Sequence, residues 1–145
     1  MGTRNTEVML RLLHDVHRIL KDQAAEFLDR QGIPMSTVVI LRHLGDSPGL
    51  TVTKLGQKSG LSKGYVSVLA DQLETDGLVT KSPDPDDQRR KRLELSKAGH
   101  DFRAKLERMH LDFLQEYLHA IPGSQIEAMI AGLQYLRAAF TRTSS

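Results

Sequence analysis

The chain has 145 residues, of which 39% are hydrophobic and 26% charged, with 20 Lys plus Arg against 18 Asp plus Glu and no Cys. This composition excludes a disordered chain, and the lack of Cys excludes disulfides, thiolate metal sites and a redox-switch thiol. The longest aliphatic run is Val38-Val39-Ile40-Leu41, far short of the roughly 18 apolar residues that span a bilayer. Since no signal-peptide pattern is visible either, we expect one cytoplasmic domain with no membrane contact.

Helical periodicity dominates the N-terminal part of the chain. Apolar residues recur at three- and four-residue steps over residues 9–28, which predicts an amphipathic helix of about six turns that ends near Gly32. Pro34 can open a second helix, because proline is tolerated at the first helical position. We expect this second helix to stop around Gly45, where residues 46–49 (Asp-Ser-Pro-Gly) predict a turn.

Two shorter helices follow, separated by a glycine. Thr51 can cap a helix over residues 52–59, and Gly60 ends it. Ser62 then caps a longer helix, residues 62–76, whose apolar side chains at i, i+3, i+4 and i+7 face inward. The inward residues of this longer helix are Val66, Leu69, Ala70 and Leu73.

The periodicity then changes from helix to strand. Residues 78–82 and 90–95 are typical of two short strands, joined by a polar loop with three Asp and two Pro. Successive side chains of a strand point to opposite sides, so the four consecutive cations at 89–92 do not form one face. Arg89 lies near the tip of the loop. Along one side of the second strand lie Arg90 and Arg92.

Two further amphipathic helices complete the chain. Ser96 can cap the first, whose apolar stripe covers residues 102–117, and Ser124 the second, with a stripe over 126–140. The apolar stripes of the three terminal helices have to be covered, and a second copy of the chain would cover them through a two-fold interface. The alternative is an intramolecular three-helix bundle. We expect the interface to include Leu12, Phe113, Ile130 and Leu133.

The middle of the chain has the order of a helix-turn-helix. A short helix, a turn with Gly and a longer helix make up that motif, and the second helix inserts its N-terminal residues into the major groove of DNA. Outward side chains there can bond base edges or phosphates, or touch a thymine methyl. The predicted DNA-contacting residues of this helix are Ser62, Lys63, Gly64, Tyr65, Ser67 and Val68. The alternative is an exposed helix of ordinary polar composition.

The hairpin after this helix has the position and charge of a wing. Residues 51–92 hold eight basic and six acidic residues, so the whole net charge of +2 lies in this segment. The tip can place Arg89 in the minor groove, with Arg90 and Arg92 as phosphate contacts. Asp87 could form an ion pair that fixes the direction of Arg89, or the loop aspartates could simply shape the turn.

Several stretches of this region resemble the multiple antibiotic resistance regulator (MarR) family. Residues 86–90 (Asp-Asp-Gln-Arg-Arg) and 95–99 (Leu-Ser-Lys-Ala-Gly) look like the wing and exit signature of that family. Residues 67–74 and 77–79 resemble its recognition helix and strand start. The family's Asp-x-Arg element falls on Asp87 and Arg89. Two positions depart from the family pattern, Val68 where many members carry Arg and Gly56 where Ala is common.

The resemblance implies a mainly α fold with a small β-hairpin wing. It implies a winged helix-turn-helix at 34–95 and a helical dimerisation region at 1–32 and 97–145. The implied function is that of a homodimeric transcriptional regulator, a repressor that binds a palindromic operator in double-stranded DNA. In that picture the recognition helix 62–76 enters the major groove and the wing 78–95 the minor groove. A small aromatic or phenolic effector releases it.

Other site residues follow from the resemblance or remain as alternatives. The implied effector pocket would involve His17, Lys21, Arg42 and His43. No phosphate loop, nucleophile elbow or pair of catalytic carboxylates is visible, so we expect no enzyme, cofactor or metal. The alternative metal or acidic-ligand site would combine His14, His17, His100 and His110. The alternative to DNA binding is a winged-helix module for protein interaction.

Overall fold

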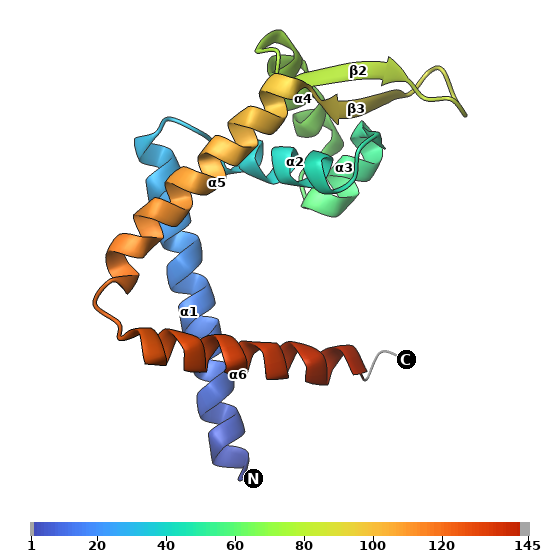
Figure 1. The fold of residues 1–145 in the computed structure, drawn as a ribbon. Coiled ribbons are helices and arrows are strands. Elements are labelled where there is room, and N and C mark those ends of the chain that lie inside the picture. The colour runs from blue at the N-terminus through green and yellow to red at the C-terminus, as the bar shows by residue number, and fades with distance from the viewer. Residues whose placement is uncertain (1, 143–145) are drawn as a thin grey trace. The chain divides into compact units, whose positions relative to one another are not determined.

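The computed structural model describes residues 2–142, and the chain divides into two compact units with the boundary after His110. In chain order (Figure 1) the elements are α1 (Thr3–Arg30), α2 (Met35–Asp46), β1 (Leu50–Thr51), α3 (Val52–Ser59), α4 (Lys63–Thr75), β2 (Val79–Pro83), β3 (Lys91–Leu95), α5 (Lys97–Leu118) and α6 (Gly123–Arg142). The predicted fold class, mainly α with a small β-hairpin, is confirmed. Helix α1 is longer than the six turns predicted. Pro34 precedes α2 as an extended residue (ψ 139°) and does not open it.

The caps that the sequence predicts around α3 and α4 are present. The Thr51 hydroxyl accepts a hydrogen bond from the Lys54 amide at 3.3 Å, and the Ser62 hydroxyl accepts one from the Tyr65 amide at 3.2 Å. Gly60 ends α3 with φ +74°, a left-handed conformation that favours glycine. These local signals fix where both helices of the helix-turn-helix begin.

Three strands form one antiparallel sheet, in the order β1, β3, β2. Val79 pairs with Leu95 and Pro83 with Lys91, which defines the hairpin, and Leu50 of β1 pairs with Leu93 on the other side of β3. Strand β1 was not predicted, because two residues are too short to show a period of two. The alternation predicted for β3 is confirmed: Leu93 and Leu95 are buried, and Glu94 between them is exposed.

The core of the first unit lies where α2, α3 and α4 meet the sheet. Its buried side chains are Ile40, Leu41, Leu44, Leu50, Leu55, Val66, Ala70, Leu73, Val79, Leu93 and Leu95. Helix α5 begins against this core with Gly99 buried, and the predicted Ser96 cap is present, since its hydroxyl accepts from the Gly99 amide at 3.0 Å. A Cβ at Gly99 would lie 2.0 Å from the Leu78 carbonyl oxygen. This glycine therefore lets α5 start directly on the hairpin.

The second unit contains the end of α5 and helix α6. The predicted Ser124 cap is wrong, since α6 begins at Gly123 and the Pro122 carbonyl accepts from the Ile126 amide at 3.2 Å. Phe113 and Tyr117 contact each other edge to face, with ring centroids 5.2 Å apart. None of the described residues of α6 is buried. Over residues 2–142, no helix combines the length and apolar content needed to cross a membrane.

Candidate nucleic-acid interface

The six residues predicted at the start of α4 are all exposed. Val68 is the most open of the large apolar side chains there, at 68% exposed. The opposite side of the helix is anchored, with Val66, Ala70 and Leu73 buried. A Cβ at Gly64 would meet no atom within 4 Å, so this position leaves room for a close approach of another molecule. Helix α4 therefore presents a polar, open N-terminal face, as predicted.

Tyr65 has a contact that the sequence does not reveal. Its hydroxyl lies 2.8 Å from the hydroxyl of Ser36, in the first turn of α2. The two residues are 29 positions apart and belong to separate helices. Ser36 was not singled out, because no local pattern marks a hydrogen bond between distant segments.

The tip of the β2–β3 hairpin is shaped by its aspartates. Asp84 Oδ1 accepts from the Asp86 amide, and Asp87 Oδ1 from the Arg89 amide, both at 3.0 Å. Of the two alternatives for Asp87, shaping of the turn is the one observed, and the ion pair with Arg89 is not formed: Asp87 Oδ2 lies 3.7 Å from Arg90 Nε instead. The i+2 amide lies within reach of a short carboxylate, which explains this geometry. Within residues 2–142, the exposed Arg89 guanidinium has no hydrogen bond or ion pair.

Two other cations of this region are used inside the unit. Arg92 is partly buried, and its Nε donates to the Gly49 carbonyl at 3.0 Å, which connects β3 to the turn before β1. Lys81 contacts the carboxylates of Asp71 and Glu74, and its side chain is only 20% exposed. Arg89 and Arg90 are thus the arginines of the hairpin that stay open to a large polyanion.

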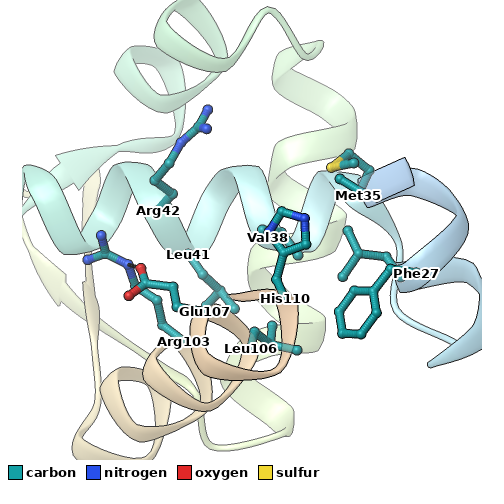
Figure 2. A pocket seen from close by; sticks show the side chains of 11 residues that line it. Phe27, Met35, Val38, Leu41, Arg42, Arg103, Leu106, Glu107 and His110 are labelled. Carbon is teal, nitrogen blue, oxygen red and sulfur yellow. Dashed lines mark hydrogen bonds and ion pairs between the residues drawn. The ribbon is translucent and has the colours of Figure 1, made fainter. Parts of the chain in front are cut away.

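A cavity of about 220 Å³ lies inside the first unit, bounded by α1, α2 and α5 (Figure 2). Its lining residues are Ala24, Phe27, Leu28, Met35, Val38, Leu41, Arg42, Arg103, Leu106, Glu107 and His110. Of the predicted pocket residues only Arg42 lines it, and in Figure 2 its guanidinium points away from Phe27 and Leu106. His17, Lys21 and His43 do not line this cavity. His17 precedes Ala24 by two helical turns, which is roughly 10 Å along the helix.

The polar side chains that line the cavity differ in whether they already have a partner. Arg103 is held by Asp46 and Glu107, with both nitrogen–oxygen distances at 3.1 Å. His110 packs its ring 5.8 Å from the Phe27 ring, and its Nε2 is buried without a hydrogen-bond partner in the described chain. From the sequence, His110 was a candidate only for the alternative metal or acidic-ligand site. Across the described residues, no group of three His, Cys, Asp or Glu has the arrangement of a metal site.

Apolar side chains stand open on the terminal helices. Leu12 in α1 is 58% exposed, and Ile130 and Leu133 in α6 are 51% and 55% exposed. Phe113 is partly buried within its own unit. Further exposed apolar residues on the same helices are Val8, Val16, Ile19, Leu20, Met129 and Phe140. Each helix alone thus leaves its apolar stripe in contact with water.

Comparison with known proteins gives a family match in the middle of the chain and one partial match to a curated relative. A model of the MarR family matches residues 33–91. A segment of 47 residues is 45% identical to the HTH-type transcriptional regulator YcgE of Bacillus subtilis. That segment covers 32% of this chain and 30% of that relative, so the match spans less than a third of the relative's length.

Solved structures match over nearly the whole chain. A MarR family protein from Bacillus stearothermophilus aligns with a TM-score of 0.76 and 24% identity, covering 97% of this chain and 99% of that one. The multiple antibiotic-resistance repressor of Listeria monocytogenes aligns with a TM-score of 0.79 and 20% identity, covering 96% and 97%. The F27L mutant of S. aureus MepR, bound to an oligodeoxyribonucleotide, aligns with a TM-score of 0.64 and 21% identity, covering 91% and 97%. Residues 33–91 thus match the model of the MarR family, and the chain shares its fold with solved structures of MarR family proteins.

Proposed function

We propose that the chain is a homodimeric repressor that binds a palindromic operator in double-stranded DNA, with α4 in the major groove and the β2–β3 hairpin at the minor groove. The observation that carries the proposal is the open N-terminal face of α4 beside a hairpin whose Arg89 has no partner within residues 2–142. An exposed arginine at a wing tip suits the negative potential of a narrow minor groove. The DNA-bound MepR mutant of the same fold supports this assignment.

The test is binding to duplexes selected from a randomised double-stranded library, followed by fluorescence anisotropy. We expect saturable, salt-sensitive binding to a near-palindrome whose half-sites lie about 34 Å apart, one turn of DNA. Failure to enrich any duplex, with only weak binding to all sequences, would contradict the proposal. That outcome would favour the alternative, a winged-helix module for protein interaction.

Arg89→Ala should weaken operator binding roughly ten-fold and lower the slope of log K against log salt by about one unit, because one fewer counterion is released. The measurement is a salt titration of the operator complex. Lys91→Ala is the matched control, because it removes the same charge two residues from Arg89, and the Lys91 side chain points to the side of the strand opposite Arg90 and Arg92. An unchanged slope for Arg89→Ala would contradict the role of the wing tip.

The proposed dimer rests on the apolar side chains that α1 and α6 expose. A helix with no buried residue has little to stabilise it in water, since most helical stability in proteins comes from packing of an apolar face. A second copy of the chain supplies a matching face, and a two-fold arrangement uses the same residues twice. The same symmetry presents two copies of α4 to the two half-sites of a palindrome.

The proposed effector is a small aromatic or phenolic molecule in the cavity of the first unit. An apolar cavity of about 150 Å³ is large enough to hold benzene, so the cavity of about 220 Å³ accommodates one ring with a polar substituent. Leaving a buried nitrogen unpaired costs about 1–3 kcal/mol. The His110 Nε2 therefore favours a ligand that carries a hydroxyl group.

His110→Phe should lower phenol affinity about three- to ten-fold and leave toluene affinity unchanged, because the variant keeps the ring and loses only the hydrogen-bonding nitrogen. Isothermal titration with both compounds gives the comparison, and toluene serves as the control of equal shape. An equal loss for both rings would mean that His110 shapes the cavity without bonding the hydroxyl. No binding of either ring to the unaltered protein would contradict the pocket.

A further inference from the structure

The start of α4 is the part of the helix-turn-helix with the fewest internal anchors. The first three residues of the helix, 63–65, are exposed, and Val66 is its first buried residue. The later part of the helix is held by buried Ala70 and Leu73 and by Lys81 of β2, which contacts Asp71 and Glu74. The end that enters the groove therefore depends on few contacts for its position.

One of those contacts is the hydrogen bond between Tyr65 and Ser36. The Tyr65 side chain extends from the third residue of α4 to the second residue of α2, where the two hydroxyl oxygens are 2.8 Å apart. A tyrosine hydroxyl has a single hydrogen to donate. Either hydroxyl can donate in the pair with Ser36, so the bond uses either that hydrogen or part of the accepting capacity of the Tyr65 oxygen, and a base contact would need the same groups. The contact joins α4 to a helix whose own residues Ile40, Leu41 and Leu44 are in the core.

We propose that Tyr65 is a positioning residue for sequence-specific binding, which fixes the N-terminal end of α4 through Ser36 instead of reading a base. This inference rests on the proposed function. Base contacts require close placement of the helix, whereas phosphate contacts supply nearly all of the non-specific affinity. Loss of the hydroxyl pair therefore lowers affinity for the operator, leaves affinity for unrelated DNA in place, and keeps the preferred base at each position.

The experiment compares Tyr65→Phe, Ser36→Ala and the double variant on a duplex selected as above and on an unrelated duplex of equal length. We expect each single variant to lose about three- to ten-fold in operator affinity, as for one net hydrogen bond. The double variant should be no weaker than either single one, since both remove the same interaction. Ser36→Thr keeps a hydroxyl and should restore parental affinity. Val68→Ala serves as a contrasting variant, because Val68 is predicted to contact a base and its loss should change which base is preferred.

Three results would overturn the proposal. A loss in Tyr65→Phe with no loss in Ser36→Ala would mean that the tyrosine hydroxyl contacts DNA itself. Additive losses in the double variant, or equal losses on the unrelated duplex, would show that the two hydroxyls do not act together on specificity. If the parent protein selects no duplex, the proposed function fails and the positioning role fails with it. The DNA titration of the unaltered protein is enough to recognise this outcome, since no variant is involved.

Discussion

Leu133→Glu is expected to raise the dissociation constant of the dimer at least about a hundred-fold. Leu133 is 55% exposed in the chain by itself, and α6 has no buried residue among those described. If a second copy covers this face, the substitution buries an unpaired carboxylate, which costs several kcal/mol. A two-fold interface contains the position twice, and about 1.4 kcal/mol corresponds to a factor of ten. Operator affinity should fall in parallel, because a monomer contacts only one half-site.

Sedimentation velocity over a dilution series measures this effect. Gln134→Glu is the matched control, because it adds the same charge one residue further along α6, about 100° around the helix and off the apolar stripe. The control should remain dimeric at the dilutions where Leu133→Glu dissociates. An intact Leu133→Glu dimer at nanomolar concentration would count against a dimer interface through α6. It would favour the alternative in which other parts of the same chain cover the apolar face of α6.

Gly99→Ala is expected to destabilise the fold by about 1–3 kcal/mol or more, lowering the thermal midpoint by roughly 5–10 °C. The added Cβ would lie 2.0 Å from the Leu78 carbonyl oxygen and 3.4 Å from Leu95 Cβ. The first of these neighbours is backbone, and it also accepts a hydrogen bond from the Ser96 amide at 3.0 Å, so it cannot move without breaking the sheet edge. Helix propensity favours Ala over Gly by only about 1 kcal/mol, too little to offset the clash.

Gly64→Ala is the control, because the same substitution is expected to raise the stability of the fold at this position. Its Cβ would meet nothing within 4 Å, so only the gain in helix propensity remains, up to about 1 kcal/mol. Thermal unfolding without DNA and at one fixed protein concentration compares the two, because the midpoint of a dimer depends on concentration. A Gly99→Ala midpoint equal to or above the parental one would contradict the close packing of α5 on the hairpin.

The parts of the fold that the sequence predicted correctly carry strong local signals. Thr51 and Ser62 are caps with a hydroxyl within reach of the amide three residues on, and Gly60 supplies a left-handed residue. Each depends on two to four neighbouring residues, so a pattern in the sequence is enough to find it. Strand β1 lacked such a signal: its two residues pair with β3, more than 40 positions away.

The candidate site was predicted less completely, for the same reason. The exposed face of α4 follows from helical periodicity alone. The partner of Tyr65, the cavity at His110 and the contact of Arg92 with Gly49 all depend on segments brought together only by the tertiary fold. The sequence left two alternatives for the loop aspartates, an ion pair with Arg89 or hydrogen bonds that shape the turn. Backbone geometry decided between them, since Asp87 reaches the Arg89 amide and not its guanidinium.

Helix α2 contributes to two places at once. Met35 lines the cavity, and the next residue, Ser36, holds Tyr65. Under the proposed function, a ligand and the operator therefore act on adjacent residues of one helical turn, and any coupling free energy between them is reciprocal. A molecule that weakens operator binding by a given factor is itself bound more weakly, by that same factor, on the DNA-bound dimer. The dissociation constant measured on the free protein is therefore lower than the concentration needed to release an occupied operator, and titrations of the complex give that concentration.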